Sequence, residues 1–326
     1  MTYKIKENYV AVKAEVTAGT VVTLADADRN GRYFEISGNP EWETTDFEYS
    51  SNGYNGSVGI AGKAAHPVTF SGYLCPSSTP ATVEPNNWGP MKHCGFAAVT
   101  YGVTGVALQD LPTADKSTCT IERGFVARGA APVGAKDVIG GAYGNVEISA
   151  TAGQPIKLAY SFQGKHVSND DLTNGEILVL TAPDTSVPPA LIGATTTLGG
   201  VSICLKSFTY NMNNAISSED CAGEDTGILY FKKDGAKPSC TISFIMPTIA
   251  EYDARAKWSS ETAEELVIVV GDFTITVPQL QLTSAPKEDT SGTVTYNGTF
   301  NALRNGGANA NLDDEASIEI LQGARA

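Results

Sequence analysis

The chain has 326 residues, enough for one large or two ordinary domains that each bury a core. Charged residues make up only 18 %, and this low share favours a surface covered by further copies of the same protein. The formal net charge is -14, and residues 166–326 carry most of the excess, with 9 basic and 21 acidic groups. Because phosphate binding needs lysine and arginine, ordinary nucleic-acid binding is disfavoured.

The amino-terminal segment, MTYKIKENYVAVKAEV, alternates polar and apolar residues and lacks the apolar core of a secretory signal. No apolar run in the sequence approaches the roughly 20 residues that a membrane-spanning helix needs. We therefore expect synthesis in a reducing cytoplasm and no membrane contact.

Ten stretches alternate with period 2 between turn residues, as half-buried strands do. In chain order they are Tyr9–Val16, Phe47–Tyr49, Val68–Leu74, Val146–Ala150, Ile156–Phe162, Leu229–Lys232, Cys240–Met246, Leu266–Val270, Phe273–Val277 and Val294–Phe300. Helical signals are few. We expect one helix over Ile249–Trp258, after Pro247, and a second short one over Trp88–Cys94, after Pro85. The sequence therefore predicts a mainly β fold.

Histidine and cysteine form no recognisable site. The cysteines include no CxxC pair, so we expect buried thiols and no metal or other cofactor; they are Cys75, Cys94, Cys119, Cys204, Cys221 and Cys240. Adjacent residues such as His93 and Cys94 rarely reach one metal together. His66, His93 and His166 belong to no nucleophile motif, and G-x-S-x-G, P-loop and dinucleotide-binding patterns are missing from the sequence. We therefore expect that the protein is not an enzyme.

The two halves of the sequence resemble each other. Four segments of the first half match segments of the second in the same order: Phe47-Glu48-Tyr49 with Phe208-Thr209-Tyr210, His66 to Leu74 with Pro238 to Met246, Asn145 to Ser149 with Gln279 to Thr283, and Tyr160 with Tyr296. This order predicts a tandem duplication, with copies at 1–165 and 166–326 and an insertion in the first copy at about 99–140. Chance matching between two β-rich halves is the alternative.

Three motifs resemble the major tail tube proteins of long-tailed bacteriophages, the siphophages and myophages. They are Trp88 to Phe96, a helix with a Cys-Gly-Phe stop; GNVEISATAGQPIKLAYSFQG from Gly144 to Gly164, two strands around Ala-Gly-x-Pro; and Pro189 to Asn214, which contains a Phe-x-x-Asn-x-x-Asn strand. The turn at Ala152-Gly153-Gln154-Pro155 has a physical basis. Gly allows unusual dihedral angles, and Pro fits at the start of the next strand, where its missing N–H donor costs least. The resemblance spans most of the chain.

The resemblance implies a tail-tube-type antiparallel β-sandwich or half-barrel, duplicated in tandem, each copy with a short flanking helix. Six such domains would close a ring, so a ring would hold three chains if the repeat holds and six if it does not. Stacked rings would form the tail tube through which DNA passes without sticking. The implied partners are further copies of the chain, the tape measure protein, the tail terminator, the baseplate or tip proteins and, in contractile tails, a sheath. The implied location is the virion tail, after assembly in the host cytoplasm.

Two groups of residues are candidates for roles in such a tube. A surplus of carboxylates could repel passing DNA, and the acidic candidates for the lumen are Glu219, Asp220, Glu224, Asp225, Glu261, Glu264 and Glu265; a solvated outer loop is the alternative for each cluster. The resemblance implies ring-stacking loops at 49–63 and 217–227, with Tyr49, Asn52, Tyr54, Asn55, Ser217, Ser218, Gly223 and Gly227 as candidates. Their Asn- and Gly-rich composition predicts mobile loops.

A second class of function stays open. Duplicated β-sandwiches also form adhesins, carbohydrate-binding proteins and capsid-decoration proteins, in which an exposed aromatic ring stacks on a sugar. The candidates are Trp42, Trp88 and Trp258, of which Trp258 is predicted to lie in the core.

Overall fold

The protein is mainly β. A computed structural model describes residues 7–29, 31–51, 54–76, 87–101, 105–110, 118–127, 133–172, 186–290, 292–303 and 319–323. It is 65 % strand and 6 % helix, with antiparallel sheets, so the predicted fold class is confirmed at this level.

The strands of the described residues run along most of the chain. They are β1 (Glu7–Ala14), β2 (Tyr33–Ser37), β3 (Glu41–Ser51), β4 (Tyr54–Tyr73), β5 (Phe96–Tyr101), β6 (Gly105–Asp110), β7 (Cys119–Ala127), β8 (Val133–Thr151), β9 (Lys157–Asp171), β10 (Thr195–Leu198), β11 (Val201–Ser202), β12 (Cys204–Asn211), β13 (Asn214–Asp220), β14 (Ile228–Ala236), β15 (Ser239–Ile245), β16 (Ala263–Val270), β17 (Phe273–Ser284), β18 (Lys287–Thr290), β19 (Thr293–Ala302) and β20 (Glu319–Gly323). Each of the ten predicted strands overlaps one of these.

The helices of the described residues are short, and one differs from its prediction. They are the 3₁₀ helices η1 (Asp26–Arg29) and η2 (Gly89–Cys94) and the α-helix α2 (Ala254–Ser259). The predicted start of the last helix, Ile249, is wrong because Asp253 is the N-cap: its carboxylate accepts the N–H groups of Arg255 and Ala256 at 3.0 and 3.1 Å. The segment before Asp253 is therefore a turn. No helix in the described part of the chain is long and apolar enough to cross a membrane.

The paired strands form two sets that follow one another in the sequence. The first set pairs in the order β1-β7-β8-β9-β4-β2. The second set pairs in the order β10-β16-β17-β19-β15-β12, with β18 also paired to β19. The sets join edge to edge because β12 also pairs with β8, with Thr209 opposite Ser149. One continuous antiparallel sheet therefore runs through both sets.

One large core lies behind this sheet and contains residues of both sets. One cluster of buried side chains includes Phe70 and Tyr160 of the first set and Phe244 and Tyr296 of the second. Within each set the two rings lie on directly paired residues, with centroids 5.1 Å apart in the first and 5.6 Å in the second. Apolar burial of this extent couples the two sets into one folded body.

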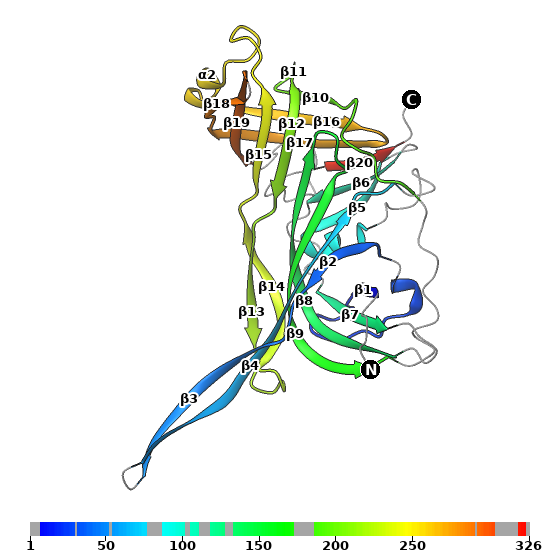
Figure 1. Cartoon of the computed structure of the whole chain (residues 1–326), viewed down its shortest axis with the longest axis vertical. Coiled ribbons are helices and arrows are strands. Elements are labelled where there is room, and N and C mark those ends of the chain that lie inside the picture. The colour runs from blue at the N-terminus through cyan, green and yellow to red at the C-terminus, as the bar shows by residue number, and fades with distance from the viewer. Residues whose placement is uncertain are drawn as a thin grey trace.

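Two hairpins extend from the sheet, as Figure 1 shows. The first arm consists of β3 and the paired part of β4, residues 54–65, and it projects beyond the rest of the molecule. The second arm consists of β13 and β14 and lies along β8 and β9. A third hairpin, β5 with β6, is bridged to β17 by β20. The segment predicted as an insertion, 99–140, therefore also contains β7 and the start of β8, which belong to the first set.

Candidate functional site

One face of the continuous sheet carries small polar side chains. Adjacent strands β9, β8, β12, β15 and β19 bury one face in the core and expose the other. We call the exposed one the polar face; its residues are Lys157, Ala159, Ser161, Gln163, Asn145, Glu147, Ser149, Thr151, Ser207, Thr209, Asn211, Ser239, Thr241, Ser243, Asn297, Thr299 and Asn301. Lys157 and Glu147 are the charged members of this set. The face is therefore almost entirely hydroxyl and amide.

Strand pairing places these side chains in rows across the sheet. In one row Ser149 lies opposite Thr209, Thr209 opposite Thr241, and Thr241 opposite Thr299. Lys157 ends the row on β9, opposite Ser149. Such rows arise because side chains alternate between the two faces of a strand, so an in-register pairing brings like positions together.

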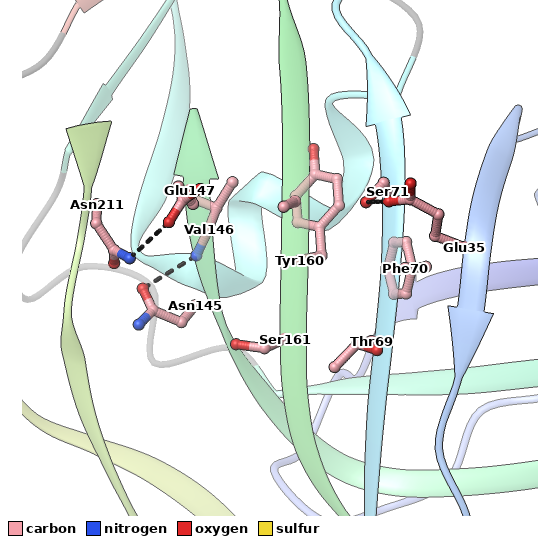
Figure 2. A pocket seen from close by; sticks show the side chains of 11 residues that line it. Glu35, Thr69, Phe70, Ser71, Asn145, Val146, Glu147, Tyr160, Ser161 and Asn211 are labelled. Carbon is pink, nitrogen blue, oxygen red and sulfur yellow. Dashed lines mark hydrogen bonds between the residues drawn. The ribbon is translucent and has the colours of Figure 1, made fainter. Parts of the chain in front are cut away.

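A hollow of about 400 Å³ lies over the first-set end of this face (Figure 2). Asn145 and Glu147 of β8 and Asn211 of β12 line one side, and the amide of Asn211 donates to the Glu147 carboxylate at 3.3 Å. Thr69 and Ser71 of β4 line the other side. The lining is hydrogen-bonding but contains few ionised groups.

Two of the three charges at the hollow, those of Glu35 and Lys157, neutralise each other. Glu35 of β2 accepts hydrogen bonds from the Lys157 ammonium at 2.5 Å and from the Ser71 hydroxyl at 2.9 Å. The bond from Lys157, followed by that from Ser71, lowers the pKa of Glu35. This carboxylate and ammonium thus form an exposed ion pair, and the surrounding surface stays close to neutral.

The predicted acidic residues lie elsewhere. None of the seven belongs to the polar face: four lie at the tip of the second arm and three in and after the turn that follows α2. Several are paired with cations, namely Asp220 with Lys63 at 2.6 Å, Glu224 with Lys165 at 2.8 Å, Glu264 with Lys257 at 2.7 Å, and Glu219 with Lys232. Asp225, Glu261 and Glu265 are exposed. The structure therefore does not bring the seven carboxylates together.

The candidate stacking residues lie at the ends of the two arms. Tyr49, Tyr54 and Asn55 belong to the paired strands of the first arm, and Asn52 lies outside the described residues. Ser217 and Ser218 belong to β13, whereas Gly223 and Gly227 lie in the turn that joins it to β14. In the first segment, 49–51 and 54–63 pair across a hairpin, whereas in the second only 217–220 belong to a strand and 221–227 form the turn. The mobility of both segments stays a prediction.

The three tryptophans lie in different environments, and Trp258 differs from its prediction. Trp88 is fully buried, so its ring is not accessible for stacking on a sugar. Trp258 is 56 % exposed rather than part of the core, and it borders a hollow of about 610 Å³ with Tyr296 and Lys287. Trp42, on the first arm, is 54 % exposed.

Histidines and thiols form no metal site in the described residues, where no three metal-binding side chains cluster. His66 and His166 are adjacent, with their Nδ1 atoms 3.3 Å apart. Four cysteines are buried as predicted, but Cys204 is exposed and Cys221 is partly exposed. Burial raises the pKa of the Cys94 and Cys119 thiols, which keeps both protonated and unreactive.

Sequence reasoning missed the polar face, although a signal for it exists. Ser239, Thr241 and Ser243 alternate with buried residues, and Asn297, Thr299 and Asn301 do the same. The alternation of Ser, Thr and Asn is visible in the sequence, but its meaning depends on which strands become neighbours.

No family model matches this chain, and no curated protein matches its sequence.

Proposed function

We propose that this protein is a tandem-duplicated tail tube subunit, which assembles into stacked rings that form a conduit for DNA. The duplication is supported by the identical succession of strands in the two sets, in which β1, β7, β8, β9, β4 and β2 correspond to β10, β16, β17, β19, β15 and β12. Two unrelated sheets would have little reason to share an order of six strands.

Residue pairing supports the same proposal, although it replaces two of the matches expected from the sequence. Phe47–Tyr49 lies in β3, whereas Phe208–Tyr210 lies in β12, the counterpart of β2, and Thr69 is matched by Ser243 rather than Thr241. Ser37 lies opposite Thr69, and Ser207 opposite Ser243. A bulge precedes this pair in both sets, between Phe34 and Ser37 in β2 and between Leu205 and Ser207 in β12. Bulges are specific features of a fold, and their coincidence favours common descent over chance.

The proposed boundaries differ from those expected from the sequence. Residue 165 lies inside β9, which ends at Asp171, and β10 starts at Thr195. We therefore put the boundary between the copies at 172–194. The β5–β6 hairpin has no counterpart in the second set, so it replaces 99–140 as the proposed insertion. η2 and α2 occupy corresponding places after β4 and β15 and are the proposed flanking helices.

The polar face is the observation that carries the conduit proposal. A wall that lets DNA pass must avoid holding phosphates, and the polar face offers Lys157 as its single cation, already paired with Glu35. With so few cations there is little counterion release to drive DNA binding. Hydroxyl and amide groups keep the wall hydrated. DNA can therefore pass without being attracted to the wall or strongly repelled by it. A neutral wall thus replaces the acidic one expected from the sequence.

In this proposal each chain contributes two tube domains, so three chains close a ring of six domains. Each polar face lines part of the lumen, and the outer surface is free for a sheath where the tail is contractile. The tape measure protein would occupy the lumen before DNA, while terminator and baseplate or tip proteins would cap the ends. The location is the virion tail.

Electron microscopy of the purified protein tests the proposal. We expect tubes or short stacks of rings, with a ring mass three times the chain mass of 34.2 kDa. A Thr241→Cys variant in a Cys204→Ser, Cys221→Ser background should react with a small maleimide in both free subunit and tube, but with a 5 kDa polyethylene-glycol maleimide only in the free subunit. Subunits that stay monomeric at high concentration, or equal labelling of tubes by the large reagent, would contradict the proposal.

The carbohydrate-binding alternative rests on the exposed Trp258 and the hollow beside it. An exposed indole next to a cavity suits stacking on a sugar ring. Glycan-array binding that is lost in Trp258→Ala, together with absence of tubes, would favour this alternative.

A further inference from the structure

The first arm joins the body at an irregular point, from which it extends away from the rest of the molecule (Figure 1). At Ala65 β4 gains a second partner, because this residue lies opposite Glu41 of β3 and also opposite Lys165 of β9. The next step into the arm contains a bulge, where the register shifts between Trp42 and Thr44. A bulge leaves a residue unpaired and bends the strand. The base of the arm is therefore a place where the hairpin can bend relative to the body.

A cluster of three rings lies at this base. His66 follows Ala65 on β4 and is fully buried, and its Nδ1 atom lies 3.3 Å from the Nδ1 atom of His166 on β9. The centroids of the two imidazole rings are 5.5 Å apart. Trp42 of the arm meets the His166 ring edge-on, with centroids 6.1 Å apart. The arm therefore packs on the histidine pair through Trp42.

This arrangement accepts His66 only as a neutral ring. The hydrogen bond between the two Nδ1 atoms needs a hydrogen on one of them and a lone pair on the other. The Nε2 atom of His66 is enclosed and has no hydrogen-bond partner among the described residues. A protonated His66 would carry a hydrogen on both nitrogens, so it would place a charged N–H group where no acceptor is available.

The charged groups near the pair leave His66 without this acceptor. They are His166 and Lys165 of β9, Asp137 of β8, Arg123 of β7, Lys63 of β4, Glu41 and Glu43 of β3, and Asp220 and Glu224 of the second arm. The buried Asp137 carboxylate accepts a hydrogen bond from the Asn169 amide at 2.7 Å. Burial has the largest effect and lowers the pKa of His66 to about 4; the charge of Asp137 opposes this shift, and those of His166 and Arg123 add to it.

Two contacts from the second arm also hold the base. The Ala64 N–H donates to the Thr226 carbonyl at 3.1 Å, and Lys63 pairs with Asp220 at 2.6 Å. This ion pair is exposed, and exposed pairs contribute little to stability in water. The histidine pair is thus the buried part of the attachment.

We propose that His66 and His166 form a proton-controlled hinge, which holds the first arm against the body while His66 is neutral and releases the arm when His66 takes up a proton. Release lifts Trp42 from the His166 ring and opens Nε2 of His66 to water, which provides the missing acceptor. Because the arm carries candidate stacking residues, acid would change the position of those residues relative to the body. The inference goes beyond the proposed conduit and does not depend on it, since it concerns the isolated chain.

The direction of the pH dependence follows from the two states of His66. In the released arm His66 is hydrated and has the ordinary pKa of 6.5, whereas in the attached arm its pKa is about 4. Between these values the proton binds mainly to the released state. Each fall of one pH unit in this range should therefore raise the ratio of released to attached arms about tenfold.

Distance measurement between the arm and the body tests the hinge. Nitroxide labels would be placed on Thr45→Cys in the arm and Thr241→Cys in the body, both exposed positions, in a Cys204→Ser, Cys221→Ser background. We expect double electron–electron resonance to show one distance at pH 7.5 and a second population that grows as the pH falls to 5. In His66→Asn the distances should not change with pH. Near-UV circular dichroism of the same samples reports whether the core stays folded.

A second variant tests the ring contact without changing a titratable group. Trp42→Ala should release the arm already at pH 7.5, because the ring that packs on His166 is removed. Trp258→Ala is the matched control, since Trp258 is exposed to a similar extent, 56 % against 54 %, and should leave the distance unchanged.

Three results would overturn the hinge. The first is a distance distribution that stays the same between pH 7.5 and 5, or that changes equally in His66→Asn. The second is loss of the near-UV signal at the pH where the distances change, because the whole fold would then open. The third is an unchanged distance in Trp42→Ala, which decides the matter even if His66→Asn does not fold. Tube formation is not measured in this experiment, so the conduit proposal stands or falls separately.

Discussion

The buried His66 shows how one side chain makes the fold sensitive to pH. It lies at the base of the first arm, fully buried, and its Nε2 has no hydrogen-bond partner among the described residues. Burial lowers its pKa to about 4, and the nearby charges of His166 and Arg123 act in the same direction, against Asp137. The folded state therefore holds His66 neutral.

Protonation of His66 should destabilise the protein in a defined pH window. Because the folded pKa lies below the ordinary value of 6.5, the stability from neutral His66 is complete above about pH 6.5 and declines as pH falls toward 4. His66→Asn should flatten the decline, as measured by urea unfolding between pH 7 and 4.5. His166→Asn, which keeps His66, is the control and should retain most of it. If the free energy of unfolding had the same pH dependence in wild type and His66→Asn, this explanation would be wrong.

At the scale of elements, the packing of the second arm against β8 depends on glycine. Gly141 and Gly153 both have positive φ, +56° and +83°, so alanine strains the backbone at each. A Cβ atom at Gly141 would meet the arm at Tyr230, whereas one at Gly153 meets nothing within 4 Å. The pair of sites therefore separates backbone strain from arm contact.

Gly141→Ala should destabilise the protein by about 1–3 kcal/mol more than Gly153→Ala, because overpacking adds to backbone strain. Chemical denaturation measures the difference. Hydrogen exchange should also show loss of protection in β13 and β14 for Gly141→Ala alone. Equal effects of the two substitutions would mean that the arm is not held at this point.

At the scale of the whole molecule, charge is separated from the polar face. The chain carries a formal charge of -14, yet Glu147 is the one carboxylate among the residues of the polar face. A tube built as proposed should retain no DNA even at low salt. Placing lysines in the wall, as in Thr209→Lys with Thr241→Lys, should produce DNA retention that falls steeply as salt rises.

The uncharged double variant Thr209→Gln with Thr241→Gln controls for side-chain size in this experiment. Retention is measured by co-sedimentation of DNA fragments added during assembly. Retention by wild-type tubes, or by the glutamine variant, would show that the wall is not the neutral surface we describe.

The fold class was predictable because strand alternation is local. Residues such as Cys240 to Met246 show period 2 whatever their neighbours, and all ten predicted strands overlap observed ones. Each arm was predicted as one strand, Phe47–Tyr49 or Leu229–Lys232, beside a loop, because Asn and Gly lower strand propensity. In the first arm, the pairing of Glu41–Ser51 with β4 overrides this propensity. The start of α2 was missed because Pro247 also signals a helix start, whereas the helix begins after the N-cap residue Asp253.

The sequence by itself determined the β class, the acidic net charge and which residues share a face of each strand, since these depend on composition and period alone. Tertiary structure decided which strands are neighbours, as when β12 joins β8 to β15 and aligns Ser149, Thr209 and Thr241 in one row. It also decided that carboxylates such as Asp220 and Glu224 meet lysines far away in the sequence. Such contacts form between segments that are far apart in the sequence, so local periodicity does not predict them.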